Sequence, residues 1–342
     1  MSIHPNLILS SEEIRDLTTR PIISYRTSRY QGGEFNVRLD RDLGDEEVEL
    51  VTEFYNELKR LLELSRPKPE SLVHEASRAA ALESFFENTR LIRLASELEQ
   101  VAVGAERTAD RQLVQILREL TGGAFHGIYA IVQLTRARET PVEGFSSLYY
   151  LTRDHLKIMR TLIPDLDPVA RAKDEQTQTH SIELMTEKWD GARFRADNRV
   201  IEVRFDSSFS GNVAERCVEF AEVDRLIYQL MQNAVQHGMG EMLQCQVDTC
   251  DGGANLRWVL TNPISPESRL RLLELIADGH SLFDAGTSLN GKGWGLNVVA
   301  QSVSNAYGLA GNAFGEEVGY YGVRIGREHF VIWFHWPVAA ED

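Results

Sequence analysis

The spacing of apolar residues changes once along the chain, and this change constrains the fold more than any other feature. Up to about residue 163, apolar side chains recur at steps of three and four, which is the period of one helix face. After about residue 180, short alternating or apolar runs are interleaved with helical runs, and strands are predicted at 200–205, 243–248, 256–260, 320–325 and 330–336. Strands that alternate with helices are typical of an α/β domain. The pattern therefore predicts a helical first half and an α/β second half.

Helices are expected over residues 46–64, 71–103, 106–139 and 145–163. In the last two of these helices, the steps between apolar residues approach the heptad alternation of a helical bundle. A short turn at 140–144 joins them into a hairpin with one apolar face. Pairing with a second copy of the hairpin would bury that face in a four-helix bundle, so we expect a homodimer.

A chain of 342 residues is too long for one ordinary core, so more than one domain is expected. We predict a multi-domain protein of α and α/β classes. Residues 1–105 form a mostly helical N-terminal regulatory region, of which 1–44 have no long periodic run. Residues 106–165 form the dimerisation hairpin. The polar, non-periodic residues 166–179 form a linker, and residues 180–342 form the α/β domain.

Charge and composition exclude several partners. The formal net charge of −15 disfavours binding to the phosphate backbone of a nucleic acid. No stretch approaches the ~20 apolar residues of a membrane span, and the N-terminus lacks the basic and apolar segments of a secretory signal. Cys217, Cys245 and Cys250 have no zinc or disulfide spacing, so free thiols are expected. These features predict a cytoplasmic protein without membrane or nucleic-acid partners.

A glycine-rich segment directly precedes a predicted amphipathic helix at 297–307. It contains Gly291, Lys292, Gly293, Gly295 and Leu296. Alternating glycines let backbone amides approach a phosphate closely, and the helix N-terminus favours an anion. The lysine adds a direct charge. Taken alone, the motif is equally compatible with a flexible loop at the start of a helix.

A second polar motif lies on the predicted helix at 222–237. Gln229, Asn233 and His237 are spaced four residues apart and therefore share one face. The amide oxygen of Asn233 is a suitable hard ligand for Mg²⁺. The alternative is that these side chains face solvent while the apolar residues of the helix face the core.

Taken together, these segments resemble histidine kinases and related GHKL-type ATPases. Residues 224–238 resemble the asparagine box, and residues 291–308 resemble the glycine box with its following helix. Phe283 stands where the family often has a phenylalanine before the ATP lid, and residues 330–337 resemble its final strand. The resemblance extends from about residue 106 to residue 337. It implies a C-terminal α/β sandwich of the GHKL ATPase type.

The resemblance also implies cofactors, partners and site residues. The cofactors are ATP and Mg²⁺, with Asn233 as the metal ligand and a catalytic role for Gln229. A response-regulator receiver domain is the implied partner. The implied ATP contacts are Asn233, His237, Asn262, Gly291, Lys292, Gly293, Gly295 and Leu296.

The chain departs from the family at two site positions. Asn262 stands nearest the position where the family has an aspartate that accepts the adenine amino proton. Loss of the ionic component of that bond costs on the order of 1 kcal/mol. Gln229 stands where many members have a carboxylate or asparagine, and a glutamine cannot act as a general base.

The sequence differs more strongly from the family at the phosphoacceptor position. Arg118 stands where the family has its phosphorylated histidine, and a guanidinium cannot attack phosphorus. His126, two turns along the same predicted helix, is the candidate that remains, although an ordinary bundle residue is the competing interpretation. For His74 and His155 the bundle interpretation is favoured.

The sequence thus predicts a histidine-kinase-like two-component signalling protein. It would transfer the γ-phosphate of Mg·ATP to a histidine and then to a response regulator. The departures keep two alternatives open. One is a catalytically silent pseudokinase or adaptor. The other is a histidine phosphotransferase that uses His126 without ATP-driven autophosphorylation.

Overall fold

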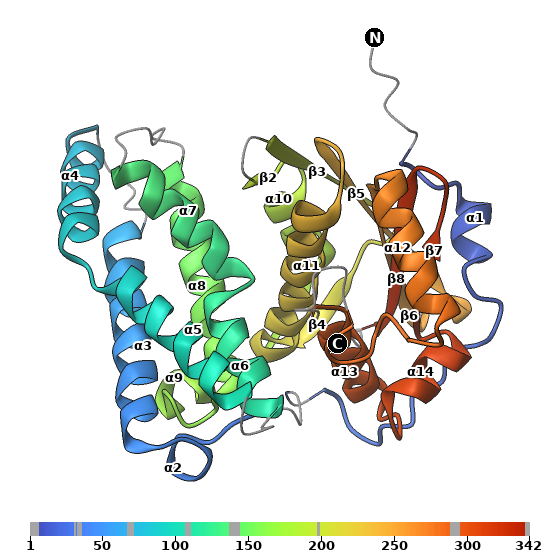
Figure 1. Cartoon of the computed structure of the whole chain (residues 1–342), viewed down its shortest axis with the longest axis horizontal. Coiled ribbons are helices and arrows are strands. Elements are labelled where there is room, and N and C mark those ends of the chain that lie inside the picture. Colours follow the sequence, from blue (N-terminus) through green and yellow to red (C-terminus); the bar gives the residue numbers. More distant parts are fainter. Residues whose placement is uncertain are drawn as a thin grey trace. The chain divides into compact units, whose positions relative to one another are not determined.

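The computed structural model describes residues 7–30, 32, 36–66, 72–106, 111–136, 144–196, 199–287 and 295–338 (Figure 1). The chain divides into two compact units. Residues 34–175 form the helical unit, and residues 1–33 together with 176–342 form the sheet unit. This division differs from the expected boundary at residue 105, because the first 33 residues belong with the sheet and not with the helices that follow.

Two of the predicted helices are present in the helical unit, and each of two others is interrupted and forms two shorter helices. Helices near 46–64 and 145–163 are present, whereas 71–103 and 106–139 each correspond to two helices. The described helices of the unit are α2 (Leu39–Asp42), α3 (Asp45–Ser65), α4 (Leu72–Asn88), α5 (Leu91–Glu106), α6 (Arg111–Thr121), α7 (Ala124–Arg136), α8 (Gly144–Leu162) and α9 (Pro168–Asp174).

Local hydrogen bonding and backbone geometry explain both helix breaks. Between α4 and α5, the hydroxyl of Thr89 accepts a hydrogen bond from the Leu91 amide (3.1 Å) and donates to Glu57 of α3 (2.6 Å). This side chain caps the start of α5 and stabilises the break. Between α6 and α7, Gly123 has a φ of 51°, a left-handed conformation that favours glycine.

The hairpin of α7 and α8 buries its apolar face within a single chain. Helix α8 packs against both α3 and α7. Its apolar stripe is buried at Leu148, Leu156, Met159 and Leu162. A second copy is therefore not needed to cover this stripe, which removes the physical reason for the expected four-helix bundle.

The segment 166–179, which was predicted to be a linker, has regular secondary structure. It contains α9 and most of β1 (Thr177–Ser181). The carboxylate of Asp167 caps α9 by accepting from the Ala170 amide (3.0 Å). Asp174 forms a buried ion pair with Arg160 of α8 (2.7 Å). Polar contacts rather than an apolar stripe hold this segment, so its sequence has no helical period.

The sheet unit contains a six-stranded sheet in the order β2–β3–β5–β6–β8–β7. Strands β3 and β5 are parallel, and the other neighbours are antiparallel. The predicted strands correspond to β3, β5, β6, β7 and β8, and the mixed α/β class is confirmed. The strands of the sheet are β2 (Arg193–Ala196), β3 (Arg199–Ser207), β5 (Met242–Cys250), β6 (Asn255–Pro263), β7 (Tyr321–Ile325) and β8 (His329–Pro337).

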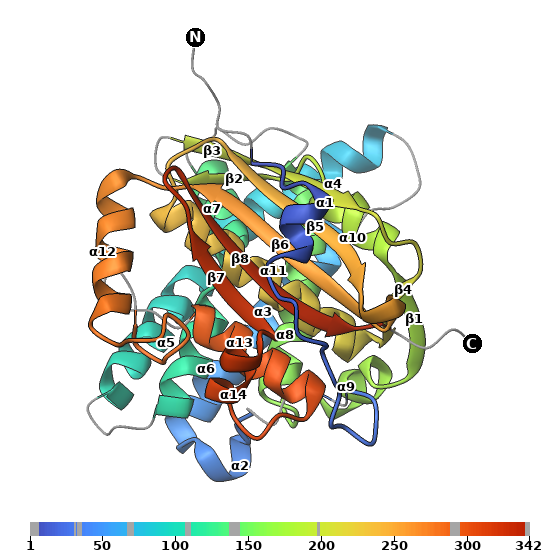
Figure 2. The ribbon, with the colours of Figure 1, turned by 90° about the vertical axis from the view of Figure 1, so that its right-hand side faces the viewer.

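Helices cover one face of this sheet. They include α10 (Ile182–Trp189), α11 (Cys217–His237) and α13 (Gly295–Tyr307), while α12 (Pro266–Ala277) and α14 (Asn312–Val318) lie toward the β7 end (Figures 1 and 2). β1 pairs separately with β4 (Asn212–Arg216). On the helix-covered face, the rings of Trp258 and Phe334 stack with their centres 5.8 Å apart.

The other face of the sheet is covered by an N-terminal strap, residues 7–30, which includes α1 (Ser11–Arg15) (Figure 2). Leu9 and Ile14 of the strap pack on Val259, Val331 and Trp333. No local sequence pattern indicates this arrangement, because the few apolar residues of the strap have no period and their partners lie more than two hundred positions away.

A buried arginine anchors the strap. Nη1 of Arg257 donates to the carbonyl oxygens of Ile14 (2.5 Å) and Arg15 (3.2 Å). Its Nε donates to Nε2 of His335 (2.9 Å), whose Nδ1 donates to the Tyr320 carbonyl oxygen (2.8 Å). Because Nε2 accepts a hydrogen bond and Nδ1 donates one, the imidazole of His335 carries a single proton and is neutral. Burial and the adjacent guanidinium lower the pKa of His335 to about 4.

Within the sheet unit, the guanidinium of Arg216 in β4 donates to the Tyr30 carbonyl oxygen at the end of the strap (2.7 Å). Within the helical unit, the Val37 amide donates to the Leu162 carbonyl oxygen at the end of α8 (2.9 Å).

The three cysteines are free, as predicted, and Cys217 and Cys245 are buried. Among the described residues, no helix combines the length and the apolar composition that crossing a membrane requires.

Unfolding of the sheet unit is expected to depend on pH through His335. Its contribution to stability is complete above the ordinary pKa near 6.5 and is lost as the pH falls toward about 4. Over that range the unfolded chain binds a proton that the folded chain does not, which corresponds to about 3 kcal/mol. All five tryptophans lie in the sheet unit, so urea unfolding followed by tryptophan emission reports on this unit.

A His335→Gln variant keeps a donor and an acceptor and should flatten this pH dependence. The control is His155→Gln in the helical unit, which should leave the tryptophan-monitored pH dependence unchanged. If the His335→Gln protein lost as much stability on acidification as the parent, the assigned neutral histidine would be wrong.

Candidate functional site

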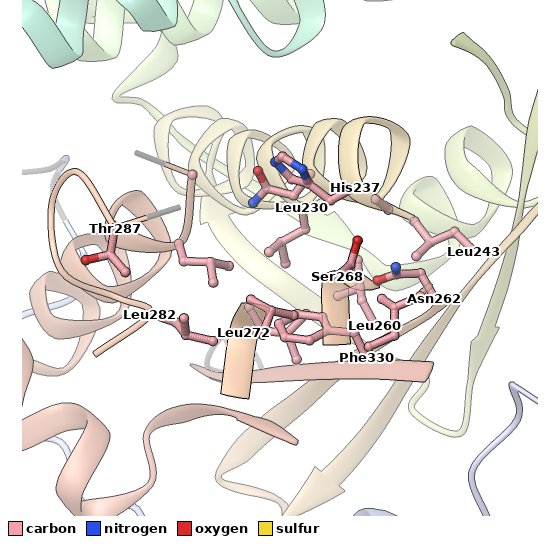
Figure 3. Close-up of a pocket in the computed structure, with 16 residues that line it drawn as sticks. Leu230, His237, Leu243, Leu260, Asn262, Ser268, Leu272, Leu282, Thr287 and Phe330 are labelled. Atoms are coloured by element: carbon pink, nitrogen blue, oxygen red, sulfur yellow. The ribbon is translucent and has the colours of Figure 1, made fainter. Parts of the chain in front are cut away.

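One cavity in the sheet unit collects residues from both sequence motifs (Figure 3). Its walls come from the C-terminal half of α11, the end of β6, the start of β8, α12 and the first turn of α13. Ten of its sixteen lining residues are apolar, and no carboxylate, lysine or arginine is among them. The cavity volume is about 90 Å³, which is less than the ~150 Å³ of an engineered cavity that binds benzene.

Buried ion pairs fix the N-terminal half of α11. Every residue from Cys217 to Tyr228 is buried. Glu222 pairs with Arg225 (2.8 Å), and Asp224 pairs with Lys188 of α10 (2.8 Å). Such pairs are costly to break because one charge would remain buried without its partner. The C-terminal half of α11, which lines the cavity, therefore extends from a rigid base.

Two acidic residues near the start of α11, Glu219 and Glu222, are buried. Glu219 pairs with Arg29 of the strap (3.1 Å), and Glu222 accepts a hydrogen bond from Ser302 of α13. The two carboxylates join α11 to the strap and to α13.

Asn233 and Gly295 bring the two motifs into direct contact. A Cβ atom on Gly295 would lie 2.6 Å from Nδ2 of Asn233 and 3.1 Å from its Cγ. Real Cβ atoms essentially never come within 3.0 Å of another atom, so with the asparagine amide in this position only a glycine fits at residue 295. The start of α13 therefore lies against the C-terminal half of α11.

The end of α11 meets the end of β6. The Met239 amide donates to the Pro263 carbonyl oxygen (2.8 Å), and Nδ2 of Asn262 donates to the same oxygen (3.2 Å). Asn262 is 8% exposed. Burial lowers the pKa of His237, so its imidazole is neutral at pH 7. The polar side chains among the described lining residues are therefore uncharged.

Five of the expected site residues line this one cavity: Asn233, His237, Asn262, Gly295 and Leu296. Gln229 lies on α11 but is not a lining residue. Gly291, Lys292 and Gly293 lie outside the described residues.

Sequence reasoning missed several residues of the cavity wall. Leu272 and Ser268 belong to α12, and Leu282 and Thr287 come from the segment that precedes α13. Their positions follow from how α12 packs, and no motif marks them. Phe283, which the motif comparison singled out, is buried with its ring centre 4.7 Å from that of Tyr321.

The candidate phosphoacceptor residues lie in the helical unit. Arg118, at the family's histidine position, forms an ion pair with Glu106. His126 is exposed on α7, just after the break at Gly123. His155 is buried, and desolvation lowers its pKa to about 4. Of the last two, only His126 presents its side chain to solvent.

The described residues contain no group of three or more His, Cys, Asp or Glu side chains that could hold a metal ion. A magnesium ion bound with a nucleotide needs fewer protein ligands, because it keeps several waters and takes phosphate oxygens. The half-buried amide of Asn233 at the cavity wall fits that limited role.

Comparison with known sequences supports the resemblance that the motifs indicated. No protein-family model matches the chain. The sensor protein CseC of Streptomyces avermitilis is 27% identical over 203 residues, which are 58% of this chain and 38% of that protein. CseC of Streptomyces coelicolor is 26% identical over 207 residues, which are 59% and 37% of the two chains. The chain thus spans less than two fifths of the length of these relatives.

Among solved structures, histidine kinases are similar to this chain. The histidine kinase domain of a blue-light activated kinase from Erythrobacter litoralis is 13% identical, with a TM-score of 0.31, over 71% of this chain and 96% of that chain. The catalytic domain of histidine kinase ThkA is 14% identical, with a TM-score of 0.26, over 46% and 85%. These TM-scores are too low to support a structural conclusion.

The contact between Asn233 and Gly295 is expected to appear as an energetic coupling. Gly295→Ala alone should destabilise the sheet unit, because the new methyl displaces the asparagine. In an Asn233→Ala background the same change should be neutral or stabilising, since alanine is better than glycine in a helix by up to ~1 kcal/mol.

Urea unfolding monitored by tryptophan emission should therefore give a coupling free energy of about 1 kcal/mol between the two substitutions. Additive effects of the two substitutions would show that the two motifs are not in contact.

Proposed function

We propose that the sheet unit is a nucleotide-binding sandwich of the GHKL ATPase type and binds Mg·ATP in the described cavity. In this proposal the chain works as a cytoplasmic histidine-kinase-like protein of two-component signalling. The observation that carries the proposal is the contact between Asn233 and Gly295. It joins the asparagine-box and glycine-box segments at one cavity.

The cavity wall suits a nucleobase. Its apolar side chains would contact the faces of a purine, while its polar side chains would meet the edge of the base. The cavity is partly open to solvent, and its volume of about 90 Å³ is smaller than a purine needs. Movement of helix α12 would enlarge it, and none of the residues of α12 is buried.

Each expected site residue has a role in this proposal. Asn233 supplies an amide oxygen to Mg²⁺. The first turn of α13, with Gly295 and Leu296, directs backbone amides at the phosphates. Gly291, Lys292 and Gly293 add further phosphate contacts. His237 and Asn262 face the base, and Gln229 acts indirectly by fixing α11, since it does not line the cavity.

The proposed acceptor is His126. A ring nitrogen of its neutral imidazole attacks the γ-phosphorus, the bond to the bridging oxygen breaks, and ADP leaves with the electron pair. The imidazole then loses its remaining N–H proton to solvent. The phosphate would pass from this histidine to an aspartate of a response-regulator receiver domain. Positioning and charge neutralisation would supply most of the rate enhancement.

A homodimer is part of the proposal, although its interface cannot be the stripe that α3 already covers. Among the described side chains of α7 and α8, Tyr129 and Tyr150 are exposed. Tyrosines are frequent in protein interfaces, so we propose that each of them contacts a second copy. Sedimentation of the intact protein at micromolar concentration tests this, and a monomer would contradict it.

A catalytically silent pseudokinase or adaptor is the second candidate function. The ion pair of Arg118 with Glu106 favours it, because the family's histidine position is occupied by a side chain that cannot accept phosphate. Gln229 cannot act as a base, which points the same way. A histidine phosphotransferase that uses His126 without ATP is the remaining alternative.

Phosphate incorporation separates these candidates. After incubation with Mg·ATP labelled at the γ-position, the intact protein should carry acid-labile, alkali-stable phosphate. His126→Ala and Asn233→Ala should each reduce the label to background, the first by removing the acceptor and the second by removing the metal ligand. His280→Ala, which removes an exposed histidine of the sheet unit, is the matched control and should retain full label.

Equal labelling of the His126→Ala and parent proteins would exclude His126 as the acceptor. An unlabelled parent protein that still binds Mg·ATP would favour the pseudokinase.

A further inference from the structure

A buried histidine lies where α6 ends and α7 begins. Helices α6, α7 and α8 pack against one another in the helical unit (Figure 1). His155 of α8 is 1% exposed, and its ring centre lies 6.3 Å from that of Phe54 and 5.7 Å from that of Phe125. Desolvation lowers the pKa of His155 to about 4. The imidazole is therefore neutral at pH 7 and has one N–H group to donate.

That N–H group is used at the end of α6. Nε2 of His155 has no hydrogen-bond partner among the described residues, and the imidazole is hydrogen-bonded to the Leu120 carbonyl oxygen, so Nδ1 is the donor. Leu120 is in the last turn of α6, where carbonyl oxygens have no partner within the helix. In an unbroken helix the Ala124 amide would donate to this oxygen. His155 supplies a donor in its place and so stabilises the break between α6 and α7.

The break determines where His126, the proposed acceptor, lies. The Phe125 amide donates to the Gly122 carbonyl oxygen (2.9 Å), and the His126 amide donates to the Gly123 carbonyl oxygen (3.2 Å). The first turn of α7 is thus built on the two glycines of the break. Because Gly123 has a φ of 51°, α7 does not continue the line of α6. The direction in which His126 projects depends on this geometry.

The residue after His126 lets α8 come close enough for this contact. A Cβ atom on Gly127 would lie 2.9 Å from Cδ1 of Leu151 of α8. A larger residue at 127 would have to displace that leucine. Leu151 is one turn before His155, so the two side chains share the face of α8 that meets α7. The close approach at Gly127 therefore supports the contact that His155 makes with the break.

We propose that His155 is a positioning residue for phosphotransfer, which holds α6 and α7 apart so that His126 presents its imidazole to the γ-phosphate. This inference rests on the proposed function. Without the donor from His155, the Leu120 carbonyl oxygen would take the Ala124 amide as its partner, which joins α6 and α7 into one helix. The joined helix carries His126 in a different direction. His155 itself is buried and touches no phosphate.

The test measures the rate of label incorporation from γ-labelled Mg·ATP into the intact protein as a function of ATP concentration. His155→Leu keeps the approximate size of the side chain and removes the donor. Its rate at saturating ATP should fall about a hundredfold, as expected when a reacting group is misplaced by about 1 Å. The half-saturating ATP concentration should not change, because ATP binds in the sheet unit. His155→Asn keeps a donor at the position of Nδ1 and should restore most of the parental rate.

Two further variants separate positioning from general stability. Gly123→Ala opposes the break from its other side, because alanine disfavours a positive φ, and it should lower the rate as His155→Leu does. Leu162→Ala removes a buried side chain two turns further along α8 and should leave the rate near that of the parent. Amide hydrogen exchange of residues 122–126 should differ from the parent in His155→Leu and match it in His155→Asn.

The outcomes distinguish this inference from the proposed function. An unlabelled parent contradicts the proposed function, and the positioning role fails with it. A labelled parent whose rate is matched by His155→Leu overturns the positioning role alone. Equal losses in His155→Asn and His155→Leu, or in Leu162→Ala, also overturn it, because the donor would then not be the cause. Should His155→Leu fail to fold, a parental rate in Gly123→Ala overturns it.

Discussion

The contact of Asn233 with Gly295 is the constraint on which the candidate site depends. The amide of Asn233 on α11 lies where a Cβ atom of residue 295 would be, so in this arrangement only a glycine fits at the start of α13. Helix α11 can hold that position because its first half is buried on all sides and its charges are paired. The outer wall of the cavity is different, since α12 has no buried residue. The site therefore combines a rigid inner wall with an outer wall that can move.

The opposite face of the sheet explains why the first thirty residues belong to this unit. Without the strap, Val259, Val331 and Trp333 would be exposed, and Arg257 would lose the carbonyl oxygens that satisfy its guanidinium. The strap then continues directly into the helical unit, and the chain returns at residue 176. Covering the sheet and attaching the helical unit are thus functions of one continuous segment.

The sequence predicted those parts of the fold that depend on local periodicity. Helices α3, α8, α11 and α13 and strands β3, β5, β6, β7 and β8 have clear periods, and they form close to where they were expected. Elements held by capping or by distant partners were missed. The cap at Thr89 and the turn at Gly123 divide helices whose apolar stripes continue through them. The strap contacts strands that lie too far along the chain for any local pattern to reveal.

The candidate site was predictable only where its residues belong to a local sequence motif. Motif spacing identified Asn233, His237, Asn262 and Gly295, which the fold brings to one cavity. It also suggested Gln229, which the helical period places on the same face but which does not reach the cavity. Residues from α12 and from the segment before α13 were not predicted, because only tertiary packing places them there. The orientation of the Asn262 amide likewise depends on a hydrogen bond that sequence cannot reveal.

The most direct measurement is the thermal unfolding of the intact protein, followed by tryptophan emission, with and without saturating Mg·ATP. A ligand that binds only the folded sheet unit stabilises it by about 2.7 kcal/mol at a hundredfold excess over its dissociation constant. The midpoint of this transition should therefore rise with Mg·ATP in the parent and rise much less in Asn233→Ala. An unchanged midpoint in the parent at millimolar Mg·ATP would contradict nucleotide binding at this cavity.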